Sequence, residues 1–130
     1  ILGEKVYQDS LVNNSRILQM NLWKPLCKKV MSSPLAIADP STVEDDDLIA
    51  TDQKFPDRIG EIYHLAFDEK QKWYWVSEMK ENEALIFKGW DNNNTEKIIK
   101  HTPHTSFNVP GQNIDKYPRE SVEARVFIVM

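Results

Sequence analysis

Short segments with a two-residue alternation of side chains, each followed by turn-forming residues, constrain this fold more than any other feature of the sequence. The clearest segment runs from Arg16 to Trp23, where alternate residues fall on two dissimilar faces. Pro25 ends it, because proline cannot donate to a β-ladder. Further strands are expected at 35–38, 61–67, 72–76, 84–89, 100–107 and 120–129. Many short strands predict a mainly β protein, an antiparallel sandwich or jelly roll with one or two short helices.

The segments between these strands carry weaker signals. Residues 1–15 are polar and weakly periodic, and we expect them to form a connection. The run from Ser41 to Glu44 fits a capping box, which predicts a short helix that ends near Ala50. The charged residues from Asp68 to Gln71 predict a turn that joins 61–67 and 72–76 as an antiparallel hairpin.

Length and charge narrow the classes of partner. The 130 residues suffice for one domain, and a net charge of -4 disfavours nucleic acid, because phosphate binding requires a basic face. No run approaches the roughly 18 apolar residues of a membrane span, and the first residues lack a secretory pattern. Cys27 is the only cysteine, which fits a reducing compartment. We therefore expect a cytoplasmic protein that binds a small molecule and contacts neither nucleic acid nor membrane.

Two histidines near the end of the chain are candidate metal ligands, because imidazole is the commonest metal-binding side chain. His101 and His104 are three residues apart, so on an extended segment they point to opposite faces and cannot both reach one ion. Pro103 excludes a regular helix that would bring them together. His64 has no acidic residue at the spacing of a metal motif and is predicted to be structural.

The last predicted strand has one polar and one apolar face. The residues of the polar face, which can line a cavity, are Arg119, Ser121, Glu123 and Arg125. The residues of the apolar face, which can meet a second layer, are Val122, Ala124, Val126 and Ile128. A guanidinium binds a carboxylate through two parallel hydrogen bonds, so either arginine can hold such a ligand. Strand geometry leaves both open, and an arginine–glutamate pair on the sheet is the structural alternative.

Several stretches along the chain share their order and composition with one protein family. They are 21–25 (NLWKP), 33–39 (SPLAIAD), 60–63 (GEIY), 73–75 (WYW), 79–91 (MKENEALIFKGWD), 104–107 (HTSF) and 118–125 (PRESVEAR). Together they resemble the fungal hydroxylase/desaturase family, which includes gibberellin desaturase-like and cephamycin methoxylase-like proteins. The resemblance implies a double-stranded β-helix and the chemistry of non-haem Fe(II)/2-oxoglutarate oxygenases. The implied reaction is hydroxylation or desaturation of a small secondary metabolite with molecular oxygen.

The resemblance also implies roles for individual residues at the end of the chain. His104 falls in the family's His-Thr-Ser-Phe match and is the implied distal ligand of Fe(II). Arg119 and Ser121 form an Arg-x-Ser pair that would hold the far carboxylate of 2-oxoglutarate. Arg125 is the competing clamp.

Three further residues are implied in substrate binding. Asn21 and Trp23 fall in a motif that the family carries as Asn-x-Trp-Arg-Pro, with Lys24 in place of the family's arginine. Trp90 follows a predicted strand and would line the pocket mouth with Asp91. The structural alternative for Trp23 is an ordinary core tryptophan.

One part of the family pattern is missing from the sequence. None of the three histidines begins a His-x-Asp or His-x-Glu pair, which in the family precedes the Asn-x-Trp-Arg-Pro strand. We therefore expect the two further ligands upstream of Ile1, and residues 1–130 to be the later part of a larger jelly-roll domain. The chain alone would be inactive and the full-length protein active. The alternative is a catalytically inactive jelly-roll binding module that lacks the first two metal ligands.

Overall fold

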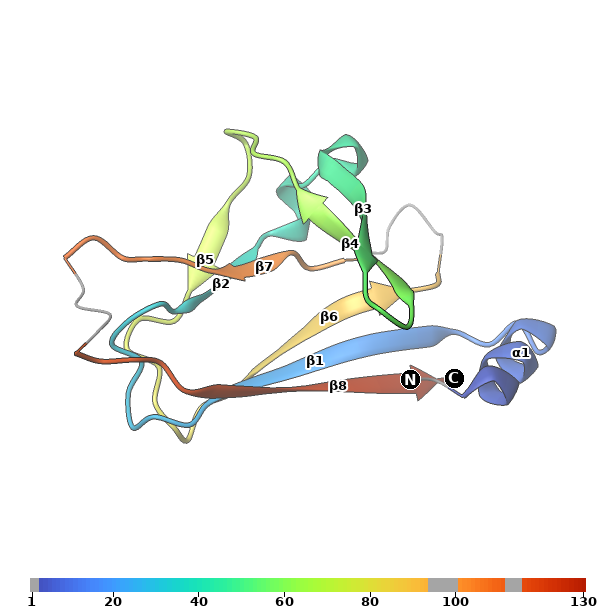
Figure 1. The fold of residues 1–130 in the computed structure, drawn as a ribbon, viewed down its shortest axis with the longest axis horizontal. Coiled ribbons are helices and arrows are strands. Elements are labelled where there is room, and N and C mark those ends of the chain that lie inside the picture. The colour runs from blue at the N-terminus through green and yellow to red at the C-terminus, as the bar shows by residue number, and fades with distance from the viewer. Residues whose placement is uncertain (1–2, 94–100, 112–115) are drawn as a thin grey trace.

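Two three-stranded antiparallel sheets form the body of the molecule (Figure 1). The computed structural model describes residues 3–93, 101–111 and 116–130. The first sheet has the order β6-β1-β8 and consists of β1 (Ile17–Pro25), β6 (Leu85–Asp91) and β8 (Ser121–Val129). The second has the order β5-β2-β7 and consists of β2 (Leu35–Ala38), β5 (Trp73–Trp75) and β7 (His104–Ser106). Because the chain passes repeatedly between the sheets, each sheet joins strands that are distant in sequence.

The remaining elements lie around these two sheets. Helix α1 (Glu4–Val12) lies beside one end of the first sheet (Figure 1). Two 3-10 turns, η1 (Pro40–Thr42) and η2 (Asp45–Asp47), lead into a two-stranded antiparallel sheet of β3 (Leu48–Lys54) and β4 (Ile59–Leu65). The described architecture is therefore mainly β, as the alternation predicts.

The apolar core lies between the two three-stranded sheets. Trp23 of β1 and Phe87 of β6 are 4% and 6% exposed and pack with Leu35 of β2. Val30 and Met79 complete the cluster from two loops that a backbone hydrogen bond joins, from Val30 N to Met79 O at 2.8 Å. We call the face of the first sheet that carries Trp23 and meets the second sheet the inner face.

The prediction of a connection over residues 1–15 is wrong, because α1 occupies much of this segment. The helix begins with a hydrogen bond from Tyr7 N to Gly3 O at 3.1 Å. Ser10 is buried and donates from Oγ to Val6 O at 2.6 Å, which takes up the hydroxyl within the helix. The polar composition that suggested a loop is that of a mostly exposed helix.

The predicted helix that ends near Ala50 is also wrong. The capping box forms three residues later than predicted, between Glu44 and Asp47, and it closes a single 3-10 turn. Leu48 then starts β3, which pairs with β4 along its whole length from Leu48↔Leu65 to Lys54↔Ile59. Cross-strand pairing therefore outweighs the local capping signal.

The predicted hairpin of 61–67 with 72–76 does not form. The turn itself is present, since Gln71 N donates to Asp68 O at 3.2 Å and Gln71 Nε2 to Ala66 O at 2.8 Å. However, β4 pairs with β3, and β5 pairs with β2 from Ala36↔Trp75 to Ala38↔Trp73. The charged turn thus links two different sheets.

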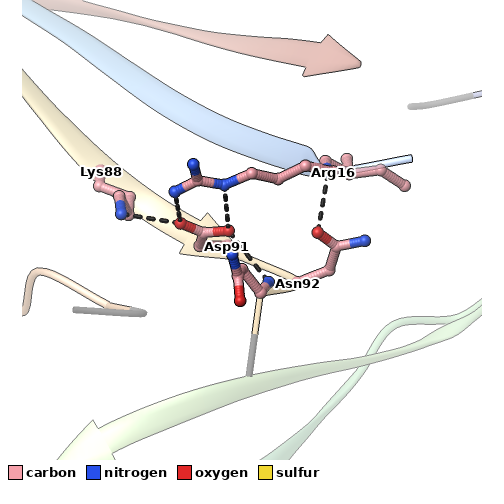
Figure 2. Close-up of polar contacts among 6 residues, drawn as sticks. Arg16, Lys88, Asp91 and Asn92 are labelled. Atoms are coloured by element: carbon pink, nitrogen blue, oxygen red, sulfur yellow. Dashed lines mark hydrogen bonds and ion pairs between the residues drawn. The ribbon is translucent and has the colours of Figure 1, made fainter. Parts of the chain in front are cut away.

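A buried carboxylate joins the start of β1 to the end of β6. Asp91 is 1% exposed and binds Arg16 through two hydrogen bonds, from Nη2 at 2.7 Å and Nε at 3.2 Å (Figure 2). Lys88 Nζ lies 2.8 Å from the same carboxylate (Figure 2). The hydrogen bond from Arg16 is the main cause of the strongly lowered pKa of Asp91, and it outweighs the effect of burial. The neighbouring Asn92 Oδ1 accepts from Ile17 N at 2.8 Å.

Candidate active site

The inner face gathers most of the residues that the sequence singles out. In the β1–β8 register Asn21 lies opposite Arg125 and Trp23 opposite Glu123, so these four side chains share the side of the sheet that meets β7. The same register places Ser121 opposite Pro25, on the same side. Side chains that belong to opposite ends of the sequence therefore line one space between the two sheets.

His104 projects toward this space from the second sheet. It pairs with Ile37 in the β2–β7 ladder, and its ring lies edge-on to that of Phe87, with centroids 4.6 Å apart. His104 Nδ1 lies 3.0 Å from the carbonyl oxygen of Thr102. A carbonyl only accepts, so Nδ1 must be the donor, and in the neutral ring Nε2 then keeps its lone pair. That is the tautomer of a histidine that binds a metal through Nε2, with its other nitrogen held by a backbone carbonyl.

Arg119 is half-buried at the edge of the same space. Its guanidinium lies over the ring of Trp23, with Cζ 5.6 Å from the ring centroid, and Nη1 donates to the carbonyl oxygen of Ser33. Ser33 has φ 45°, a left-handed conformation that turns its peptide at this point. Nε and Nη2 of Arg119 have no acceptor among the described residues, so a two-nitrogen edge remains for a carboxylate.

Arg125 is the more exposed of the two candidate clamps. Its side chain is 66% exposed, and Nε lies 3.2 Å from Glu123 Oε1. This contact is the arginine–glutamate pair that the sequence offers as the structural alternative. An exposed pair of this kind contributes little to stability.

Asn21, Trp23 and Trp90 occupy neighbouring positions on the inner face. Asn21 is 2% exposed, and its Oδ1 accepts from Gln19 Nε2 at 3.0 Å. Trp90 lies opposite Gln19 in the β1–β6 register and is half-buried, whereas Trp23 is part of the core. Asp91, by contrast, is held by Arg16 and Lys88 and does not line this space.

The apolar face of β8 is open among the described residues. Val122 and Val126 are both 49% exposed and Ile128 is 39% exposed, so any second layer on this face would have to come from outside these residues. The polar face of β8 lies on the inner side, together with Asn21 and Trp23. His101 is half-buried, with its ring 5.5 Å from that of Tyr63.

The chain supplies a fitting ligand for iron but not a complete set. Within residues 3–93, 101–111 and 116–130, no three His, Cys, Asp or Glu side chains lie close enough together to hold a metal ion. His104 fits by its tautomer and by its place opposite the inner face. A complete set of three would therefore need at least one ligand from outside these residues.

Three residues that sequence reasoning missed shape this site. Phe87 contacts the ring of His104, and Gln19 binds the amide of Asn21. Gly89 lies beneath that pair of amides at a β-bulge. A glycine inside a predicted strand is a known sign of a bulge or of close approach, and it is the signal that was available.

Sequence comparison assigns the chain to an oxidoreductase family. The chain belongs to the family described as Oxidoreductase/YMDC permease-like domain, whose match covers residues 2–129. The dioxygenase tstK of Talaromyces stipitatus, named as alpha-ketoglutarate-dependent, is 38% identical over 112 residues, covering 85% of this chain and 40% of that protein. The hydroxylase/desaturase asaB of Aspergillus flavus is 32% identical over 123 residues, covering 84% of this chain and 53% of that protein. The predicted membership in the fungal hydroxylase/desaturase family is confirmed.

A solved structure shares the whole described fold. The iron and alpha-ketoglutarate-dependent endoperoxidase NvfI superposes with a TM-score of 0.81 at 28% identity, covering 100% of this chain and 47% of that one. The predicted mainly β, jelly-roll class is confirmed by this likeness. The chain spans about half the length of the relatives it matches. No helix among the described residues has the length and apolar character needed to cross a bilayer.

Proposed function

We propose that the full-length protein that carries this chain is an Fe(II)/2-oxoglutarate-dependent oxygenase that hydroxylates or desaturates a small secondary metabolite. The observation that carries the proposal is His104, whose Nε2 lone pair remains for a metal and whose ring lies beside the inner face. The names of the relatives support the same chemistry and do not favour the metal-free binding module. In this proposal residues 1–130 are the later part of a larger jelly-roll domain, and the remaining ligands lie outside them.

Different side chains of the chain would bind the metal, 2-oxoglutarate and the substrate. His104 would provide one metal ligand, and Arg119, with Ser121 nearby, would hold the far carboxylate of 2-oxoglutarate. Trp23 supports the guanidinium from one side, so that little freedom is lost when the ligand binds. Iron and 2-oxoglutarate, when bound, would activate molecular oxygen, which is the oxidant for removing a substrate hydrogen. Trp90 would contact the substrate at the mouth of the space between the sheets.

The proposal is tested by binding and turnover of 2-oxoglutarate in the full-length protein. We expect Fe(II)-dependent binding under anaerobic conditions, seen by calorimetry and as visible charge-transfer absorption. Addition of oxygen should then give iron-dependent succinate formation. Absence of binding in iron-loaded protein would contradict the oxygenase and support the binding module. The upstream coding sequence gives a second check, since the enzyme requires a His-x-Asp or His-x-Glu pair there.

Replacing Arg119 with alanine is expected to weaken 2-oxoglutarate binding about 100-fold, because a two-nitrogen hydrogen bond to a carboxylate is lost. Arg119→Lys should recover only part of this loss, since lysine keeps the charge without the planar fork. Dissociation constants from calorimetry provide the measurement. Arg58→Ala is a matched control, because Arg58 also lies over an aromatic ring, 4.5 Å from the centroid of Phe55, but in the turn between β3 and β4. A larger effect for Arg125→Ala than for Arg119→Ala would exchange the roles of the two arginines.

We further propose a cytoplasmic protein whose partners are a small-molecule substrate and molecular oxygen, without nucleic acid. The net charge of -4 supports the last point, since it gives phosphate little attraction. Cell fractionation with antibody detection would test the location.

A further inference from the structure

A buried amide on the inner face has an unused donor group. Asn21 is 2% exposed, and the only hydrogen bond of its side chain among the described residues is the one that Oδ1 accepts from Gln19 Nε2. No fully buried side-chain nitrogen or oxygen of these residues lacks a partner, so the Nδ2 group must reach accessible space. At this position Nδ2 donates to water or to a bound ligand, and an oxygen of a ligand would replace that water.

The two amides lie over a glycine that leaves room for them. The β1–β6 register shifts between Gln19 and Met20, so that Gly89 falls at the bulge. A Cβ at Gly89 would lie 2.8 Å from Gln19 Nε2 and 3.4 Å from Asn21 Oδ1. An alanine would therefore push away the end of the Gln19 side chain. Because Gly89 has no side chain, the inner face has room for the side-chain amides of Gln19 and Asn21 at this point.

The direction of the hydrogen bond determines what Asn21 can recognise. Gln19 donates to Oδ1, so the oxygen of Asn21 is engaged and its two N–H donors are left for another acceptor. Asn21 lies opposite Phe87 in the register, and the Phe87 ring contacts His104. A donor at this position, with an arginine opposite on β8, suits an anionic oxygen of a ligand between the sheets.

We propose that Gln19 is a positioning residue that holds the amide of Asn21, over Gly89, so that its N–H group donates to a carboxylate oxygen of 2-oxoglutarate. This inference rests on the proposed function, because 2-oxoglutarate is the ligand that the function supplies. Gln19 itself does not touch the ligand. It acts by fixing which end of the Asn21 amide faces the space between the sheets.

Two substitutions disturb the amide pair by different routes. Gln19→Leu removes the donor to Asn21, and Gly89→Ala displaces it through the added methyl group. In the full-length protein loaded with Mn(II), each is expected to weaken 2-oxoglutarate binding about fivefold, the effect of losing one oriented hydrogen bond. The double variant should bind no more weakly than either single one, because both remove the same contact. Gly60→Ala is the matched control, since the nearest atom to its Cβ is 3.6 Å away.

A second measurement separates positioning from a general loss of structure. The side-chain amide signals of Asn21 in nitrogen-15 NMR spectra should shift when 2-oxoglutarate is added to wild type, and should already differ in both variants without ligand. Unfolding midpoints should stay close to wild type. Wild type that binds 2-oxoglutarate with both variants unchanged in affinity would overturn the inference alone. Wild type that does not bind 2-oxoglutarate would overturn the proposed function, and with it the ligand named here.

Discussion

Replacing His104 with alanine is expected to lower the iron affinity of the full-length protein by more than about 100-fold, because groups that only orient a ligand already cost about 10–100-fold when removed. Turnover of 2-oxoglutarate should then fall to the background seen without iron. The physical reason is that Nδ1 is committed to the Thr102 carbonyl, so Nε2 is the one nitrogen of this ring that can bind metal. Iron content after dialysis and succinate formation are the measurements.

The matched control for this experiment is His101→Ala. His101 lies on the same segment, and its ring contacts Tyr63, so its loss should leave iron content and turnover unchanged. His104→Ala also removes the edge contact with Phe87, which is worth about 1 kcal/mol. The unfolding midpoint must therefore be reported for both variants. Wild-type turnover in a folded His104→Ala protein would remove His104 from the metal site.

Most strand positions could be predicted from the sequence, with β3 (Leu48–Lys54) the exception, but strand partners could not. The alternation from Arg16 to Trp23 gives the two faces of β1, and the apolar run of 35–38 coincides with β2 (Leu35–Ala38). The charged turn at Asp68–Gln71 suggests a hairpin because turn chemistry is local. Yet the partner of β5 is β2, which comes more than thirty residues earlier, as the pair Ala38↔Trp73 shows. Pairing depends on burial and on neighbours across the sheet, which no local signal contains.

The site could be predicted only where side-chain parity, the alternation of side chains between the two faces of a strand, determines which residues lie together. Parity places Ser121, Glu123 and Arg125 on one face, and the register joins that face to Asn21. Parity does not tell what covers the apolar side of β8, which is exposed among the described residues. The contact of His104 with Phe87 depends on the packing of two sheets, and it arises only in the folded chain.

Replacing Asp91 with alanine is expected to destabilise the full-length protein by about 3 kcal/mol, the lower end for breaking a buried ion pair. The lower end applies because Arg16 and Lys88, with side chains 36% and 23% exposed, can turn to water once the carboxylate is gone. The change is large against a total stability of about 5–15 kcal/mol. It should loosen the junction between the start of β1 and the end of β6. Denaturant unfolding measures the difference, and Asp52→Ala on the exposed strand β3 is the control, with an expected change within about 0.5 kcal/mol.

The pH dependence distinguishes a charge effect at Asp91 from simple packing. The pKa of Asp91 is lowered in the folded protein, mainly by the hydrogen bond from Arg16, whereas an unfolded aspartate has a pKa of about 3.9. The carboxylate therefore stabilises the fold fully above the unfolded pKa, and this contribution declines as the pH falls from about 4 toward the lowered value. Asp91→Asn keeps the shape without the charge, so its deficit relative to wild type should be about 1 kcal/mol smaller at pH 3 than at pH 6. An equal deficit at both pH values would mean that Asp91 stabilises this junction through its packing and not through its ion pairs.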